Sequence, residues 1–169
     1  MAARKLICVL FGILAISAWV LGSAIQVGAE TLKCRNTTTV TKSEELPVSD
    51  EEGHILGVSI SEGLAFCDTG EIVKMRTHRA YDVMPGGVTQ MISYNVYTFE
   101  DGSAFVTRSQ RFIAPDGSAK TTGEIIKGTG RFEGIKGSGS ATGKTFPPGK
   151  GEALRVFNDS TFTYTLPNK

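Results

Sequence analysis

The segment Gly-Thr-Gly-Arg-Phe-Glu-Gly-Ile-Lys-Gly-Ser-Gly, residues 128–139, is the most informative stretch of this sequence. Its repeated glycines allow positive φ angles, which a chain needs to turn a tight corner. Phe132 and Ile135 are apolar residues of the segment that can plug the end of a barrel. Strand-like sequence precedes the segment and follows it. We therefore expect a sharp corner between two strands.

Turn signals recur at short intervals in the chain after residue 29, and no helix-period stretch lies between them. Turns at such regular spacing indicate consecutive strands. The turn signals are Asp68-Thr69-Gly70, Pro85-Gly86-Gly87, Asp101-Gly102, Asp116-Gly117, Gly128-Thr129-Gly130, Gly137-Ser138-Gly139 and Pro147-Pro148-Gly149. The predicted strands are residues 31–41, 54–66, 71–83, 88–99, 103–113, 118–127, 138–146 and 152–166. The acidic stretch Ser43–Gly53 is interpreted as a solvated loop.

The number of strands favours a closed sheet. An open meander of eight strands would leave two bare edges, and closure removes them. The predicted fold class is therefore all-β: a closed antiparallel eight-stranded up-and-down barrel. A barrel of this size is just wide enough to be filled by side chains or to hold one small ligand.

The first 29 residues have the three parts of a secretory signal. Arg4 and Lys5 precede an apolar run at 6–21, and a stretch of small residues ends at Ala29. An uncleaved membrane anchor is the alternative. We expect a signal helix at 1–29 and one barrel domain at 30–169, secreted or periplasmic, with no stable membrane span after cleavage.

The charge of the expected mature chain excludes some partners. Removing Arg4 and Lys5 from the 18 basic residues leaves 16 against 17 acidic residues, a net charge of about −1. Nucleic acids and anionic membranes require a basic surface, which this composition does not supply. No nucleic-acid partner is predicted.

Two cysteines, Cys34 and Cys67, remain after removal of the signal. They lie near the start of the first predicted strand and at the end of the second, which meet at the same end of an antiparallel pair. We predict a disulfide between them, with two separately buried thiols as the alternative. His54 and His78 have no ligand spacing to the cysteines, so neither a metal site nor a cofactor is predicted.

Residues 128–139 match the pattern G-T-G-[KR]-[FY]-x-G-x-x-G-x-G, and the chain thereby resembles the allene oxide cyclase and dirigent-like barrel superfamily. The resemblance implies an eight-stranded barrel with an apolar cavity, in which this segment makes a short helical turn between two strands. In the plant cyclases the cavity steers ring closure of a fatty-acid epoxide, and in dirigent proteins it orients phenolic intermediates. The chain is similar to uncharacterised exported bacterial members. Membership of the lipocalins, which have barrels of similar shape, is disfavoured because their usual Trp near the first strand is absent.

Alternation of apolar residues predicts which strand faces point into the barrel. At 54–66 the even positions are apolar apart from Glu62, so the even face is predicted to point inward. A carboxylate there would need a partner or a raised pKa. At 71–83 the odd face is predicted inward, which places Arg79 inside and His78 outside.

The next two strands contribute two more candidates. At 88–99 the even face is predicted inward and includes Tyr94. A two-residue hairpin at Asp101-Gly102 turns Arg111 inward, whereas a one-residue change in that loop would substitute Arg108. The candidate ligand-binding cluster is therefore Glu62, Arg79, Tyr94 and Arg111.

Three functional hypotheses follow from this barrel. The first is an exported module that binds a small hydrophobic or carboxylated ligand, with Arg79 or Arg111 pairing its acid and Tyr94 orienting it. Its structural alternative is a filled barrel in which Glu62 pairs with an arginine. The second hypothesis is an isomerase or cyclase of the allene oxide cyclase kind, with Glu62 as the candidate catalytic residue. The third is a structural or interaction barrel, for which the resemblance implies a homo-oligomer.

Overall fold

The computed structural model describes residues 28–150 and 152–167 and forms one closed barrel. The predicted all-β fold class and the number of strands are confirmed. The predicted signal, 1–29, lies outside the described residues except for its last two. The elements are β1 (Glu30–Pro47), β2 (Ile55–Cys67), β3 (Ile72–Val83), β4 (Thr89–Thr98), β5 (Ala104–Ile113), β6 (Ser118–Thr129), the short 3-10 helix η1 (Gly130–Phe132), β7 (Lys136–Phe146) and β8 (Arg155–Thr165).

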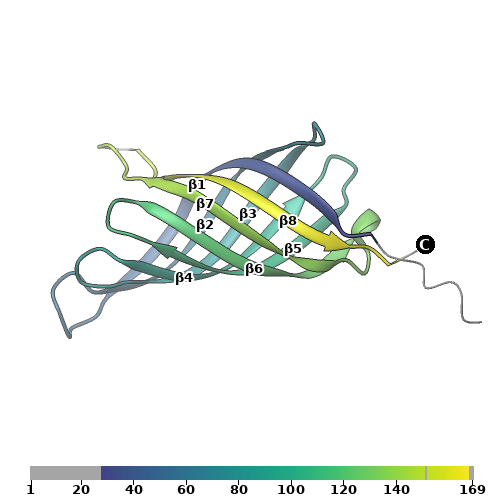
Figure 1. Ribbon diagram of the computed structural model, residues 1–169. Helices are drawn as coiled ribbons and strands as arrows, with labels where there is room; N and C mark the ends of the chain where they lie inside the picture. Colours follow the sequence, from purple (N-terminus) through teal and green to yellow (C-terminus); the bar gives the residue numbers. More distant parts are fainter. Residues whose placement is uncertain (1–27, 151, 168–169) are drawn as a thin grey trace, which may run out of the picture.

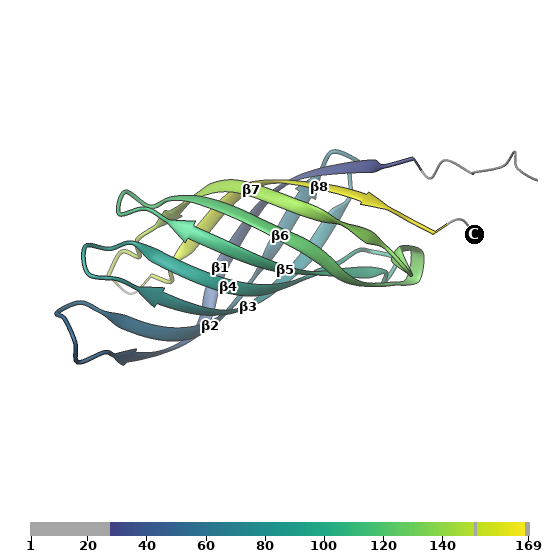
Figure 2. The same cartoon turned by 60° about the horizontal axis from the view of Figure 1, so that its bottom comes forward.

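The barrel has an up-and-down topology, visible in Figure 1. Each strand pairs antiparallel with the next one in the chain, and β8 pairs with β1 to close the sheet. The connections β2–β3, β4–β5 and β6–β7 consequently lie at one end, here called the closed end. The connections β1–β2, β3–β4, β5–β6 and β7–β8 lie at the other, here called the open end, and both sets are seen in Figure 2.

Four hairpins share the same three-residue loop, which ends in glycine. In each, the glycine has a positive φ of 81–86° and its amide donates to the carbonyl of the residue before the loop at 2.9–3.0 Å. Such loops are a common three-residue hairpin type and require a left-handed residue at the last position. The loops are residues 68–70, 85–87, 100–102 and 115–117.

Aromatic side chains plug the closed end. Phe105 is only 1% exposed, and its ring centroid lies 4.8 to 5.8 Å from those of four other rings. Phe132 from η1 and Ile135 are both buried, as the sequence predicted. The neighbouring rings are Tyr97, Phe99, Phe132 and Phe162.

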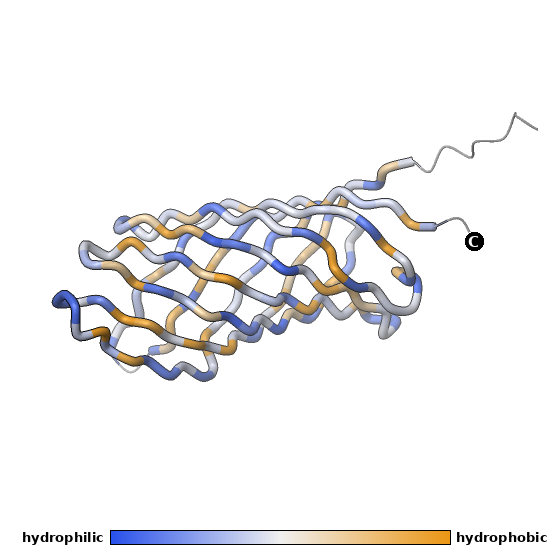
Figure 3. Tube along the Cα trace, turned by 90° about the horizontal axis from the view of Figure 1, so that it is seen from below, coloured by the Kyte–Doolittle hydropathy of each residue, from blue (hydrophilic) through white to orange (hydrophobic). Residues whose placement is uncertain are grey.

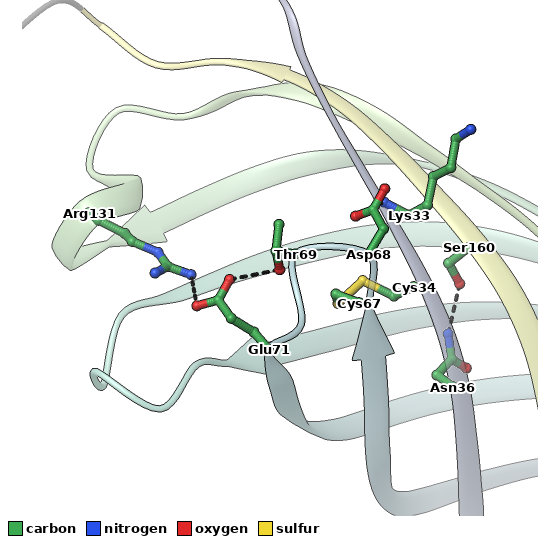
Figure 4. Close-up of a disulfide and its surroundings, with 9 residues drawn as sticks. All are labelled: Lys33, Cys34, Asn36, Cys67, Asp68, Thr69, Glu71, Arg131 and Ser160. Carbon is green, nitrogen blue, oxygen red and sulfur yellow. Dashed lines mark hydrogen bonds and ion pairs between the residues drawn. A yellow bond between two sulfur atoms is a disulfide. The ribbon is translucent and has the colours of Figure 1, made fainter.

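Polar contacts fasten the corner at residues 128–139 to the rest of the closed end, shown in Figure 4. The Arg131 guanidinium lies over the rings of Phe99 and Phe132, 4.6 and 4.9 Å from their centroids. It also donates to Glu71 at 2.6 Å. The signature arginine thus holds the 3-10 turn against the β2–β3 hairpin.

The predicted disulfide between Cys34 and Cys67 is present. These residues are directly opposed partners in the β1–β2 ladder, with Cα atoms 4.0 Å apart. The bridge lies at the closed end, next to the Asp68 turn (Figure 4). It ties β1 to the strand with which it forms its longest pairing.

The structure corrects one boundary. β1 continues through Ser43 to Pro47, so only residues 48–54 form the connection to β2. The acidic stretch predicted as a loop is therefore half strand. A bulge between Val40 and Lys42 lets β1 keep its pairing with β2 through this polar sequence.

The structure also reverses two predicted faces. On β2 the odd positions point inward, and Leu56, Val58, Leu64 and Phe66 are exposed on the outer face. Figure 3 shows hydrophobic residues alternating with polar ones along the strands of the barrel. The inward row of β2 must be small because a Cβ at Gly57 would lie 2.4 Å from the Tyr81 ring, and one at Gly63 would collide with the backbone of β1.

On β4 the odd positions also point inward, so the predicted even face is wrong there too. Val96 is partly buried, whereas Ile92 and Tyr94 are exposed on the outer face. The predicted faces of β3 and β5 are confirmed. The described residues contain no helix with the length and hydropathy of a membrane-spanning segment.

Candidate functional site in the barrel interior

The interior has three levels along the barrel axis. The aromatic plug fills the closed end, a polar belt crosses the middle, and an open mouth lies at the other end. The belt contains two arginines, Arg79 and Arg111, among amides and hydroxyls. Its buried uncharged members are Asn36, Thr38, Ser59, Ser61, Thr77, Ser93, Thr107, Ser109, Asn158 and Ser160, and Asn95 is part-buried beside them.

The mouth is a cavity of about 680 Å³. Below it lies a smaller inner cavity of about 50 Å³, within the polar belt. Arg79, Met91 and Val156 line both cavities and so form the floor of the mouth. The apolar residues of the mouth are Val40, Val83, Met91, Ile113, Ala114, Pro115, Phe146, Pro147, Pro148, Ala153, Leu154 and Val156.

β7 contributes almost no side-chain volume to the interior. Its inward row consists of Gly137, Gly139, Ala141 and Gly143, followed by Thr145. A Cβ at Gly143 would lie 2.3 Å from the Asn158 amide oxygen. The bare backbone of β7 therefore makes room for the large side chains of β8 and for the polar belt.

Arg79 projects inward from β3. Its Nη2 donates to Ser61 Oγ at 2.7 Å, while its buried Nε has no partner among the described residues. Burial lowers the pKa of this guanidinium below its ordinary value. Arg79 is therefore a cation at the floor of the mouth with a free donor.

Arg111 lies deeper, on β5. Its Nη1 donates to Asn158 Oδ1 at 2.6 Å and to Thr121 Oγ1 at 3.4 Å. Its buried Nη2 has no partner in the described part of the chain. Burial, and then repulsion by Arg79, lowers the pKa of Arg111 to about 10.

Amide side chains connect the belt into two hydrogen-bonded chains. In one, Asn158 accepts from Arg111 and donates to Asn36, which donates to Ser160 at 2.8 Å. In the other, Asn95 accepts from Thr77 and donates to the hydroxyls of Thr107 and Ser109. Such networks fix the orientation of each member, and the first one orients the Arg111 guanidinium.

Tyr81 stands at the rim of the mouth. Its hydroxyl donates to Glu45 at 2.8 Å, and burial followed by this carboxylate raises its pKa to about 12. The phenol is therefore neutral at physiological pH and links β3 to the extended end of β1. Thr145 Oγ1, on the opposite wall, is buried with no partner among the described residues.

The structure brings together half of the predicted cluster. Arg79 and Arg111 lie inside, and Arg108 is exposed. The predicted two-residue hairpin at 101–102 is wrong, because the loop is residues 100–102, and Arg111 points inward only because the predicted face of β4 is reversed as well. The predicted interior placement of Glu62 is wrong, because its strand face points outward, where its carboxylate lies 3.7 Å from Arg76. An internal pair between Glu62 and an arginine is thereby excluded.

The predicted interior placement of Tyr94 is also wrong, since its side chain is 46% exposed on the outer face. His78 is exposed on the outside, as expected. The sequence reasoning missed Tyr81 at the rim and the amides of Asn36 and Asn158. Strand parity is the signal that points to the amides, because Asn36 shares the face of Cys34.

Nothing in the described residues gathers three His, Cys, Asp or Glu side chains as a metal site would. The inner cavity is lined by hydroxyls, amides, two guanidiniums and a few apolar groups, with no carboxylate among its described lining residues. This donor-rich arrangement is chemically suited to an anionic group.

Comparisons with known proteins find similarity only at the level of structure. No known family model and no curated protein matches the chain. The pterocarpan synthase dirigent protein GePTS1 aligns over 86% of this chain and 95% of its own, with 14% identity and a TM-score of 0.49. The pterocarpan synthase dirigent protein PsPTS1 aligns over 83% and 97%, with 13% identity and a TM-score of 0.45.

Proposed function

We propose that this protein is an exported barrel that binds a small amphiphilic carboxylate in its open end. The apolar walls of the mouth receive the body of the ligand, and its carboxylate faces Arg79 on the floor. The observation that carries this proposal is a part-buried arginine, whose buried Nε has no partner among the described residues, at the base of a largely apolar cavity.

The size and lining of the mouth support a small-molecule site. Its volume of about 680 Å³ falls within the range of roughly 300–1,000 Å³ that is usual for ligand pockets. Such pockets are mostly apolar, with a few polar groups that fix orientation. Arg79 is a group of this kind, and guanidinium groups recognise carboxylates through charge-assisted hydrogen bonds.

Export is supported by the disulfide. Disulfides persist in oxidising compartments and are rare in the cytosol. The Cys34–Cys67 bridge is consistent with a protein that works outside the cytosol.

The exposed position of Glu62 disfavours the cyclase alternative. That hypothesis assigned ring opening to a carboxylate inside the barrel, and Glu62 lies outside. The acidic residues that line the mouth are Glu45, Asp116 and Glu152, near its rim. A binding role requires no reacting group and fits the interior better.

The test is isothermal titration of the full-length protein with octanoate and, separately, with octanol. Octanoate is expected to bind, and Arg79→Met is expected to weaken it at least tenfold, because a hydrogen bond to a charged group contributes about 1.5–3 kcal/mol. Arg76→Met, on the outer face of the same strand, is the matched control and should bind as the wild type does. Absence of octanoate binding, or equal affinity in Arg79→Met, would overturn the proposal.

A second candidate function is an interaction barrel that assembles with copies of itself. The outer face of β2 and β4 exposes Val58 and Ile92, which flank Ala80 of β3 in the same cross-strand row. Contiguous exposed apolar surface marks interaction sites in soluble proteins. Light scattering should then give a mass that is a multiple of the monomer and falls to the monomer value in Val58→Lys.

A further inference from the structure

Two cationic side chains line the inner cavity. Arg79 enters it from β3 and Arg111 from β5, and both line the same space of about 50 Å³. Neither guanidinium forms an ion pair with any acidic residue of 28–150 or 152–167. Two part-buried like charges without a counter-charge are an unusual feature of a protein interior.

The hydrogen bonds around the cavity leave donors in excess. Arg79 Nε and Arg111 Nη2 are both buried and unpartnered within the described chain. The amide oxygens of Asn36, Asn95 and Asn158 are already occupied by donors from the two chains of the belt. The described residues therefore offer no hydrogen-bond acceptor to these two donors.

Loss of a proton does not resolve the repulsion. The pKa of Arg111 is lowered to about 10, which still leaves its guanidinium charged at neutral pH. A buried charge is costly unless a partner of opposite sign lies beside it. An anion between the two groups would supply both the opposite charge and the hydrogen-bond acceptor.

The size of the cavity limits that anion. About 50 Å³ exceeds the minimum of roughly 10–15 Å³ that one water-sized group requires, and it is far below the volume of a drug-sized ligand. A halide, a formate or the carboxylate end of a longer molecule meets this limit. Arg79, Met91 and Val156 line both this cavity and the mouth, so the two spaces adjoin at these residues.

We infer that Arg79 and Arg111 form an anion site in the inner cavity, which takes either a compact free anion or the carboxylate head of a ligand seated in the mouth. The carboxylate arm of this inference rests on the proposed function, and the free-anion arm does not. In both cases the anion accepts from Arg79 Nε and Arg111 Nη2.

The first experiment measures thermal unfolding of the full-length protein while chloride replaces gluconate at constant ionic strength. Gluconate is too large for the inner cavity. The exchange therefore changes the occupancy of the anion site while the screening of charges by salt stays constant. We expect Tm to rise by about 3 °C for each tenfold increase of chloride above its dissociation constant. An unchanged Tm overturns the free-anion arm.

Variants then locate the effect. Arg111→Met should abolish the chloride-dependent rise, and Arg111→Lys, which keeps the charge, should retain it at higher chloride concentration. Arg108→Met, three residues away on the outer face of β5, should keep the full rise. If the chloride-dependent rise in Tm persists in Arg111→Met, the assignment of the anion site to Arg111 is overturned. If Arg111→Met fails to fold, the shift of the rise to higher chloride concentration in Arg111→Lys decides the assignment.

A competition experiment separates the two sources of the anion. If the octanoate head occupies the inner site, its apparent dissociation constant rises in proportion to chloride, while that of octanol stays constant. If neither chloride nor Arg111→Met changes the dissociation constant of octanoate, the proposed function stands and the carboxylate arm is overturned. Chloride stabilisation without octanoate binding would overturn the proposed function, and the carboxylate arm with it, and would support the free-anion arm.

Discussion

Replacing Phe105 by alanine should strongly destabilise the barrel, because this ring lies at the centre of the aromatic plug. It is 1% exposed and has four ring neighbours within 5.8 Å. Removing a fully buried Phe forfeits about 2–3 kcal/mol of transfer free energy. The wall around it is a hydrogen-bonded closed sheet that cannot collapse, so a cavity of roughly 100 Å³ adds about 2 kcal/mol.

We therefore expect Phe105→Ala to lower the free energy of unfolding by about 4–5 kcal/mol. The matched control is Phe112→Ala on the same strand, whose ring is 47% exposed on the outer face and whose loss should cost about 1 kcal/mol or less. Urea unfolding followed by circular dichroism measures both. Equal losses in the two variants would refute the assignment of the β5 faces and of the plug.

Three other perturbations probe the ends of the barrel. Reduction of the Cys34–Cys67 disulfide, which spans 33 residues, should lower the free energy of unfolding by about 3–4 kcal/mol in urea titrations with reductant. Arg131→Ala should cost about 1–2 kcal/mol by the same assay, through lost ion pairs and ring contacts, and Arg131→Lys should recover part of that loss. Hydrogen bonding to Asp50 raises the pKa of His54, so the stability difference between wild type and His54→Asn should be greatest below about pH 6.5. It should shrink as the pH rises through the folded-state pKa, and a constant difference from pH 6 to 9 would contradict this reasoning.

The sequence predicts the strands and their closure well because turns are local. Each three-residue loop contains the glycine that its turn requires, so the turns can be predicted from the local sequence without knowledge of distant residues. Pairing of Cys34 with Cys67 likewise follows from their positions at one end of neighbouring strands. These features depend on short-range chemistry and on the need to cover sheet edges.

The strand faces are harder to predict because they depend on loop length. An inward even face on β2 and an inward odd face on β3 would oppose Glu62 to an odd-numbered residue, whereas the structure opposes Glu62 to Arg76. A slip of one residue exchanges the two faces of a strand. Cys67 is the residue that fixes the parity of β2, since its partner Cys34 is buried inside the barrel.

The candidate site was half predictable for a related reason. Arg79 and Arg111 stand out as charges on strand faces that are predicted to point inward, and both lie inside. The apolar rows of β2 and β4 suggested interior faces, but the interior at that depth is a polar belt with small side chains. Hydrophobic alternation identifies the buried face only where the buried side of the sheet is itself apolar.

The seam between β1 and β8 has a consequence for how the chain folds. Seven of the eight pairings join strands that are adjacent in sequence, whereas the seam opposes Glu30 to Tyr164. Closing a loop of that length costs about 2 kcal/mol more in chain entropy than closing a loop of about ten residues. We therefore expect formation of the seam to limit the folding rate, and its amides to exchange with solvent through the lowest-energy opening of the sheet.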